Sequence, residues 1–237
     1  MTESQKRRKA KNAYERERRR LHRLHRFENS ARGQGHVLIG GIDEVGRGPL
    51  AGPVVAACVV AEGPLMLRGL NDSKVVRPEV RLELDAQIKA CCVAWAVGIA
   101  SVEEINRINI YWASILAMER ALQALAASPD YLLTDAVRIK SYSRPQEPVI
   151  KGDAKCATVA AASIVAKVYR DRLLVELDRI EPRYGFADHK GYATPAHIAA
   201  LRAHGPSAYH RTAFWRVRDA QLALDLQAVE LAGLADD

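Results

Sequence analysis

Apolar residues recur along most of the chain with two spacings, that of a strand and that of a helix. Short apolar runs predict strands at residues 36–43, 52–61, 93–100 and 131–137, and a turn rich in Gly and Pro joins the first two as a hairpin. Helical spacing predicts helices over residues 78–91, 109–127 and 154–180, with weaker ones over 195–203 and 219–234. Polar residues 141–148 and glycine-containing residues 185–191 predict loops. We therefore expect an α/β fold with a small C-terminal helical part.

The first 33 residues differ from the rest of the chain in charge. They contain twelve Lys or Arg against four Glu, a net charge of +8, whereas the remaining 204 residues carry 23 basic and 24 acidic side chains, a net charge of −1. We therefore divide the chain into a basic N-terminal extension (residues 1–35), either helical or disordered, and a main domain (residues 36–237). The extension favours a polyanionic partner, because Lys and Arg displace counterions from a phosphate backbone. A solvated tail without a partner fits the composition equally well.

The composition also argues against several kinds of site and location. The longest uncharged stretches have 14 and 13 residues, against the roughly 20 apolar residues of a membrane span. No short apolar run follows the N-terminal charges as in a secretory signal, so we expect a cytoplasmic protein. The four cysteines form no C-x-x-C and the seven histidines show no tight ligand spacing. We therefore expect the cysteines in the core and no zinc site.

Four acidic residues lie where the pattern predicts strand ends or a helix start. Asp43 and Glu44 close an apolar strand, Asp135 ends another, and Asp153 precedes the long helix. Strand ends can converge on one edge of an α/β sheet, where four carboxylates would repel one another unless divalent cations offset their charge. Oxygen ligands without Cys or His favour Mg²⁺ or Mn²⁺. Two such ions can activate a water and stabilise the leaving oxygen in phosphodiester hydrolysis.

Each acid also has a simpler explanation. Asp153 could cap the long helix, and Asp135 could be an exposed strand end. Neighbours on a strand point to opposite faces, so Glu44 reaches the same site as Asp43 only if the strand ends or bulges there. From the residues alone these alternatives stay open.

A glycine-rich turn follows the first two acids. Its glycines have the spacing G-x-G-x-x-x-G, and a Val-rich strand follows them. A dinucleotide-binding loop requires one residue fewer and a helix, and a phosphate-binding P-loop requires Gly-Lys-Ser/Thr, so neither is predicted. What remains is a tight turn whose backbone can approach a ligand closely, with Arg47 available for a phosphate.

Several blocks of sequence resemble the bacterial type 2 ribonuclease H family, ribonuclease HII. They are GIDEVGRGPLAGPVV (residues 41–55), NDSK (71–74), KGD (151–153), AASIVAKVYRD (161–171) and HKGY (189–192). The blocks occur in the family's order between about residue 36 and about residue 216, which makes a chance match remote.

The resemblance implies a ribonuclease H-like fold, a mixed central sheet flanked by helices, and a catalytic domain over residues 36–237. It implies a metal-dependent endoribonuclease that hydrolyses the RNA strand of RNA–DNA hybrids. It also implies nicking 5′ of ribonucleotides embedded in duplex DNA, which leaves a 3′-hydroxyl and a 5′-phosphate and removes misincorporated ribonucleotides. The family's ligands for two divalent ions, Mn²⁺ or Mg²⁺, fall on Asp43, Glu44, Asp135 and Asp153.

The same resemblance assigns substrate contacts. Gly46, Arg47 and Gly48 would contact the 2′-hydroxyl, which is what distinguishes RNA from DNA at a nucleotide. Tyr192 would pack against the deoxyribose that follows the ribonucleotide. The residues expected to line the phosphate path are Lys74, Ser163 and Lys167.

One departure and two rival functions remain. Family members commonly have Arg-Ser-Phe after a late His-Arg, whereas His210-Arg211 is followed by Thr212-Ala213-Phe214, which puts that serine's phosphate contact in question. A type 3 enzyme would carry an additional N-terminal domain, for which the extension is too short. A non-catalytic nucleic-acid binding protein is disfavoured by the complete set of four acids, and another nuclease of this fold, such as a junction resolvase, by the Gly-Arg-Gly block and Tyr192. We expect a monomer.

Overall fold

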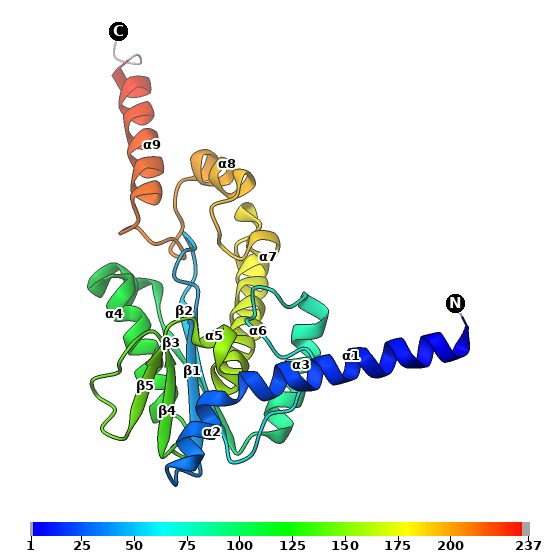
Figure 1. Cartoon of the computed structure of the whole chain (residues 1–237). Coiled ribbons are helices and arrows are strands. Elements are labelled where there is room, and N and C mark those ends of the chain that lie inside the picture. The colour runs from blue at the N-terminus through cyan, green and yellow to red at the C-terminus, as the bar shows by residue number, and fades with distance from the viewer. Residues whose placement is uncertain (1, 234–237) are drawn as a thin grey trace. The chain divides into compact units, whose positions relative to one another are not determined.

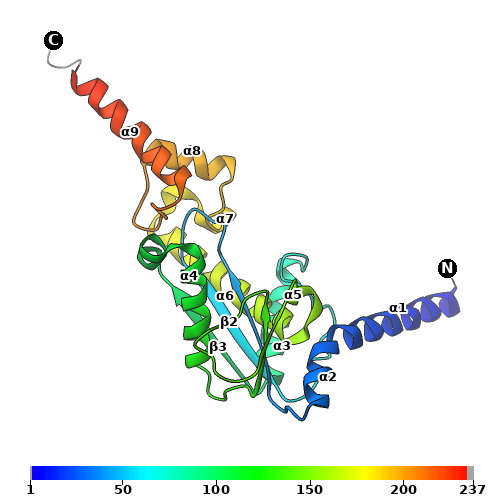
Figure 2. The ribbon, with the colours of Figure 1, turned by 60° about the vertical axis from the view of Figure 1, so that its left-hand side comes forward.

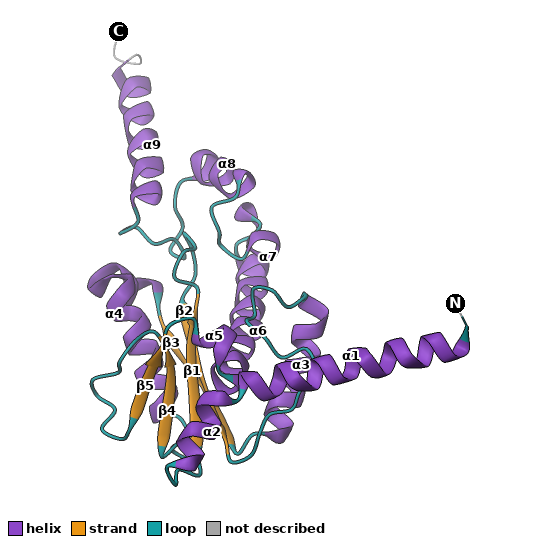
Figure 3. Cartoon of the chain, viewed as in Figure 1, coloured by secondary structure: helices purple, strands orange, loops and turns teal. Residues whose placement is uncertain are grey.

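The computed structural model of the chain describes residues 2–233. The strands are β1 (Ile39–Val45), β2 (Val54–Ala61), β3 (Ala94–Ala100), β4 (Tyr131–Asp135) and β5 (Gln146–Val149). The helices are α1 (Glu3–Leu24), α2 (Arg26–Gly33), α3 (Pro78–Cys91), α4 (Val102–Gln123), α5 (Gly152–Lys155), α6 (Ala157–Ile180), α7 (Phe186–His189), α8 (Pro195–His204) and α9 (Trp215–Gly233), with a 3₁₀ turn at Pro182–Tyr184. Figures 1 and 3 show their arrangement. Within residues 2–233, no helix is long and apolar enough to span a bilayer.

The strands form one sheet in the order β3-β2-β1-β4-β5. The three strands at one end run parallel, with Ile42 opposite Thr134 and Asp135 opposite Val149. A central sheet with flanking helices confirms the predicted fold class. The loop predicted at residues 141–148 is wrong in its last part, because β5 begins at Gln146. A polar strand containing Pro148 is typical of a sheet edge, where a strand needs one hydrogen-bonded neighbour only.

Two predicted helices have different starts in the structure. α4 begins at Val102 and is interrupted at Asn109, whose φ is 65°. The Asn109 side chain accepts the N–H groups of Tyr111 and Trp112, so it restarts the helix as a cap. The helix predicted over residues 154–180 is two helices, α5 and α6, which are separated at the extended residue Cys156.

The described chain forms two compact units. The first unit comprises, within the described residues, 2–44, 56–98 and 118–168, and it contains most of the sheet. One of its cores joins α2, α6 and three strands through Ala31, Ile39, Leu133, Val149 and Val159. A Cβ on Gly41 would lie 2.1 Å from the backbone of Thr158. The beginning of α6 therefore lies directly on β1, which only glycine permits.

The N-terminal extension forms α1 and α2, and part of it packs onto the rest of the first unit. Leu21 and Leu24 are buried, and the carboxylate of Glu17 accepts the N–H of Gly69 at 2.9 Å. Glu28, which is buried, accepts the backbone N–H of Thr158 at 2.8 Å and its hydroxyl at 3.0 Å. Because Thr158 is the second residue of α6, Glu28 caps that helix. The first half of α1 extends away from the sheet (Figure 2).

The second unit comprises, within the described residues, 45–55, 99–117 and 169–233. Its core is built from Leu50, Leu174, Phe186, Leu201 and Val217, among others. Two buried histidines, His197 and His210, lie in this unit, with their Nε2 atoms 3.0 Å apart.

Candidate active site

Asp43 faces the long helix from the middle of the sheet. Side chains two apart on a strand lie on one face, so Asp43 is on the same face of β1 as Gly41, against which α6 begins. Five residues along α6, Ser163 donates a hydrogen bond to the Asp43 carboxylate. Oδ1 of Asp43 also accepts the backbone N–H of Glu44 at 2.9 Å. Asp43 is therefore buried and fixed from both sides.

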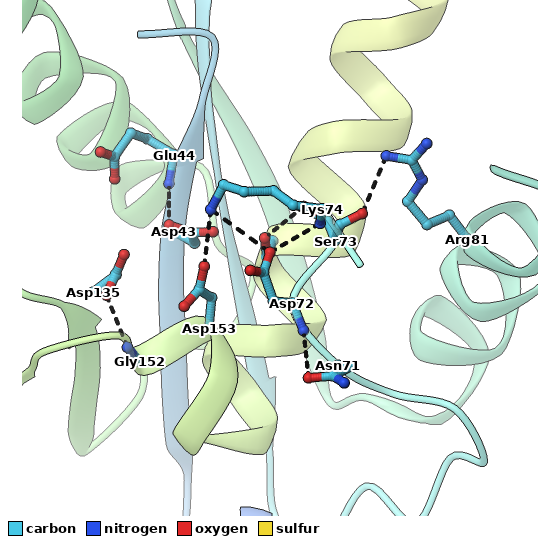
Figure 4. A network of polar contacts seen from close by, with 11 residues as sticks. Asp43, Glu44, Asn71, Asp72, Ser73, Lys74, Arg81, Asp135, Gly152 and Asp153 are labelled. Carbon is cyan, nitrogen blue, oxygen red and sulfur yellow. Dashed lines mark hydrogen bonds and ion pairs between the residues drawn. The ribbon is translucent and has the colours of Figure 1, made fainter. Parts of the chain in front are cut away.

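Glu44 follows Asp43 within β1, which continues to Val45. The strand therefore does not end at Asp43, and the two side chains leave it in different directions (Figure 4). Nevertheless, the charge of Glu44 raises the pKa of Asp43. The two carboxylates thus interact electrostatically although they are neighbours on one strand.

Asp135 and Asp153 enter the same network from the next parallel strand and the short helix after β5 (Figure 4). Oδ1 of Asp135 accepts the N–H of Gly152 at 2.8 Å, which ties the end of β4 to the start of α5. Oδ2 of Asp153 accepts a hydrogen bond from Lys74 Nζ at 3.0 Å. No side chain caps the N-terminus of α5, which contains Asp153. The long helix α6 begins only at Ala157, and Glu28 caps it. The alternative that Asp153 caps the long helix is therefore wrong.

Burial and like charge dominate the electrostatics of this network. Burial, then the charges of Glu44, Asp135 and Asp153, raise the pKa of Asp43 well above its usual range, against the hydrogen bond from Ser163. Burial also raises the pKa of Asp135, although the Gly152 N–H and the charge of Lys74 counter it. Burial lowers the pKa of Lys74, but its hydrogen bond to Asp153 and the surrounding carboxylates raise it more. The network thus favours any added cation.

Lys74 is held in place by the loop that precedes it. Its backbone N–H donates to Asp72 Oδ1 at 2.9 Å, and Asp72 Oδ1 also lies 3.6 Å from Lys74 Nζ. The hydroxyl groups of Ser73 and Ser163 lie 2.9 Å apart, so α6 holds this loop through the same serine that bonds to Asp43. Lys167 lies half-buried one turn further along α6.

The acids supply oxygen donors but do not form a finished coordination shell. Among the described residues, no three His, Cys, Asp or Glu side chains are arranged to hold one ion. The structure instead shows the Lys74 ammonium bonded to Asp153. Carboxylates with a raised pKa and no nitrogen or sulfur donor suit a hard divalent cation. The donor chemistry therefore fits such an ion, provided that side chains adjust around it.

The glycine-rich turn belongs to the second unit and is held by two buried arginines. Arg211 donates to the carbonyl oxygens of Gly46 at 2.6 Å, Arg47 at 3.0 Å and Gly52 at 2.7 Å. Arg170 donates to the carbonyls of Ala51, Pro53 and Lys190, each at 3.0 Å. Burial lowers the pKa of Arg170 to about 10 and, with the charge of Arg170, that of Arg211 to about 9.

The turn is glycine-dependent at Gly46. Its φ is 94°, and a Cβ there would lie 2.2 Å from Arg170 Nε. Arg47 is exposed at the turn. Tyr192 lies beside the turn, since a Cβ on Gly48 would be 3.9 Å from its ring, and 43% of Tyr192 is exposed.

The eleven predicted site residues thus form two sets. The first unit contains Asp43, Glu44, Lys74, Asp135, Asp153, Ser163 and Lys167, and the second contains Gly46, Arg47, Gly48 and Tyr192. Thr212 and Ala213 are exposed, and the N–H of Ala213 donates to Asn106.

Sequence reasoning missed the two arginines that hold the turn. Arg170 was detectable, because it follows Ser163 and Lys167 at helical spacing on one face of α6. No local pattern marks Arg211 as buried, because its partners lie about 160 residues earlier in the chain.

Comparisons with known proteins agree with the sequence blocks. The sequence model of a family described as Ribonuclease HII matches residues 40–217. A curated protein named Ribonuclease HII from Myxococcus xanthus is 52% identical over 202 residues, which cover 85% of this chain and 69% of that protein.

Two solved structures are similar in fold. The crystal structure of ribonuclease H2 from Pyrococcus horikoshii OT3 has a TM-score of 0.68 at 25% identity, over 78% of this chain and 98% of that one. The crystal structure of Bst-RNase HIII in complex with Mn²⁺ has a TM-score of 0.61 at 21% identity, over 86% of this chain and 72% of that one.

Proposed function

The chain belongs to the ribonuclease HII family and is an endonuclease with ribonuclease H activity on RNA–DNA hybrids, and we propose that it also nicks duplex DNA on the 5′ side of single embedded ribonucleotides. The products would be a 3′-hydroxyl and a 5′-phosphate. Such a cut would begin the removal of misincorporated ribonucleotides from DNA. We propose that the protein acts in the cytoplasm.

The observation that carries the proposal is the network of four acids around Lys74 in the first unit (Figure 4). We propose that Asp43, Glu44, Asp135 and Asp153 hold two divalent ions, Mg²⁺ or Mn²⁺. When bound, these ions would supply an activated water and stabilise the leaving 3′ oxygen. The raised pKa of Asp43 supports this assignment, because a divalent cation would offset the like charges that raise it.

The residues around the acids would orient the substrate. Ser163 holds Asp43 and, through Ser73, the loop of Lys74, so the acid and the cation are positioned by one side chain. Lys74 and Lys167 would contact phosphates of the strand that is cut. Since Lys74 is bonded to Asp153, its contact with a phosphate would require that ion pair to open.

Recognition of the ribonucleotide is proposed for the turn of the second unit. Gly46 and Gly48 would allow close approach of the backbone to the 2′-hydroxyl, and Arg47 would contact a phosphate. Arg211 and Arg170 bind the turn's carbonyl oxygens, and the N–H groups of Leu50 and Gly52 donate to the carbonyls of Gly191 and Tyr209, so the backbone of the turn is held in one shape. The exposed ring of Tyr192, beside Gly48, would pack on the following deoxyribose. Gly48 also lines a cavity of about 550 Å³ with Trp215 and Arg216, which suits a nucleic-acid strand.

The test is incubation of the protein with duplex DNA that contains one ribonucleotide, in the presence of Mg²⁺ or Mn²⁺. A single nick 5′ of the ribonucleotide is expected, and an all-DNA duplex of the same sequence should stay intact. Asp43→Asn should abolish the nick while substrate binding remains measurable. No nick, or equal cutting of the all-DNA duplex, would overturn the proposal.

A further inference from the structure

A groove lined by basic residues lies in the first unit, outside the acid network. It has a volume of about 500 Å³ and is formed where the end of α1 and the start of α2 meet α5 and the loop before Asp72. Its lining includes Arg20, Arg23, Arg26, Asn71, Ala154 and Lys155. We call these residues the basic groove.

The basic groove adjoins the acid network along the chain on two sides. Asn71 directly precedes Asp72, and its side chain accepts the N–H of Asp72 at 3.0 Å. Ala154 and Lys155 directly follow Asp153 in α5. Figure 4 shows Asn71, Asp72 and Asp153 as parts of one neighbourhood. A chain of phosphates that passes the acids would therefore continue along residues that line the groove.

Contacts on both sides fix the arginines of the groove. Before them, Glu17 accepts the N–H of Gly69, and after them Glu28 caps α6 through Thr158. Between these anchors, Leu21 and Leu24 are buried. Arg23 and Arg26 are exposed at the groove, so they are presented from a packed segment of the extension.

The charges of the groove suit an anion. Four of its lining residues are cationic and none is acidic. Arg20 is engaged with Glu17 through two hydrogen bonds of 2.8 Å, and Lys155 Nζ donates to the carbonyl of Ile150. The guanidinium group of Arg26 lies over the ring of Phe27, 4.5 Å from its centroid, a contact that leaves its in-plane N–H groups for hydrogen bonds. The guanidinium groups of the exposed residues Arg23 and Arg26 are therefore the principal groups for a ligand. Guanidinium groups bind phosphate oxygens in pairs of hydrogen bonds.

We propose that the basic groove is a second backbone-binding site, in which Arg23 and Arg26 bind phosphates of the duplex beside the point of cleavage. This inference rests on the proposed function, since it assumes that the substrate duplex passes the acids. In this proposal, the basic residues of the N-terminal extension that bind the duplex lie at the end of α1 and the start of α2, where the extension is packed. The distal part of α1 makes no specific contact with the duplex.

The experiment compares two double variants with the same loss of charge. Arg23→Gln/Arg26→Gln removes the groove contacts at the end of α1 and the start of α2, and Arg8→Gln/Arg16→Gln removes two exposed arginines from the distal part of α1. The affinity of each full-length variant for duplex DNA that contains one ribonucleotide is measured against salt concentration without divalent metal. Because no cleavage occurs in this assay, its outcome is independent of whether the protein nicks the duplex.

Affinity falls as salt rises, and each phosphate contact contributes about −0.9 to the slope of log affinity against log salt. The groove variant should therefore make this slope shallower by about 1.8. The distal variant should keep the wild-type slope. Arg23→Lys/Arg26→Lys should also keep it, which separates the loss of charge from a disturbance of helix packing. Equal slopes for the groove and distal variants, or a shallower slope than wild type in the Lys variant, would overturn the proposal.

Discussion

The ammonium nitrogen of Lys74 lies 3.0 Å from a carboxylate oxygen of Asp153, so one of the four acids is already paired with a cation of the chain. Asp153 is buried, whereas the Lys74 side chain is largely exposed. The pair offsets part of the negative charge of the network, and a divalent ion bound by the acids would compete with it.

Replacing Lys74 by Gln should therefore tighten metal binding. An ion pair with one exposed partner contributes up to about 1 kcal/mol, so opening it weakens metal affinity by up to about fivefold, and the variant avoids that cost. Titration calorimetry with Mn²⁺ in the absence of substrate measures the effect. Arg81→Gln, which alters a hydrogen bond to the same loop and not the ion pair, is the control. Weaker metal binding by Lys74→Gln would contradict the competition.

Asp43→Asn should stabilise the metal-free protein although it removes activity. The pKa of Asp43 is raised, so the folded state disfavours its ionised form. Stability of the metal-free wild type therefore falls as pH rises above the unfolded value of about 4. The neutral amide removes this dependence, and a gain of about 1 kcal/mol would raise Tm by about 2–4 °C. Thermal unfolding in a chelator at pH 7 tests this, and an equal or lower Tm of the variant would contradict it.

Glu28→Ala should destabilise the fold although Glu28 belongs to the N-terminal extension. The variant removes the cap of α6 and leaves the Thr158 N–H without its partner, for which a loss of about 1–2 kcal/mol is typical. Glu28→Gln keeps an acceptor oxygen and should recover most of the loss. Glu15→Ala, which removes a partly exposed ion pair with Arg18, is the matched control and should change Tm little. Equal melting temperatures for Glu28→Ala and Glu15→Ala would show that the cap contributes nothing.

Arg211→Lys should weaken discrimination between ribonucleotide and deoxyribonucleotide. One ammonium group cannot reach the carbonyls of Gly46, Arg47 and Gly52 together, and each buried carbonyl left without a donor costs about 1–3 kcal/mol. The turn would lose its fixed shape. The rate of nicking of a duplex with one ribonucleotide, divided by the rate for the all-DNA duplex of the same sequence, would therefore fall. Arg202→Lys on the exposed side of α8 should leave the ratio unchanged. A wild-type ratio in folded Arg211→Lys would contradict a positioning role.

The second unit should lose stability in mild acid. Burial, then the charge of His197, lower the pKa of His210 from 6.5 to about 3. Below about pH 6.5, His210 binds a proton in the unfolded chain but not in the folded chain. The contribution of neutral His210 to stability is therefore fully present above that pH. It is lost by up to about 1.4 kcal/mol per pH unit as pH falls toward 3. His210→Gln should show a smaller fall in Tm between pH 7 and 5, and His22→Gln, an exposed histidine, should behave as wild type.

Local patterns in the sequence determined the strands, the main helices, and the acids that lie at strand ends or before a helix. Apolar runs identified β1, β2 and β4, whose middle residues are buried on both faces, and also the edge strand β3, which is apolar although alternate residues are partly exposed. β5 was missed because it is a four-residue edge strand with the polar sequence Gln-Glu-Pro-Val, which contains no apolar run. The break between α5 and α6 was missed because small residues continue across Cys156 without a helix-breaking residue.

Only the tertiary structure decided the roles that depend on distant residues. Sequence left Asp153 as either a cap or a site residue, and its contact with Lys74, 79 residues away, settled where its carboxylate lies. Sequence treated the N-terminal extension by its charge alone, whereas Glu17 and Glu28 join it to Gly69 and Thr158. The burial of Arg170 and Arg211 likewise follows from carbonyl groups that only the fold brings to them. Periodicity records which face of an element is buried, but not which distant group meets it there, and that pairing sets the chemistry of each polar side chain.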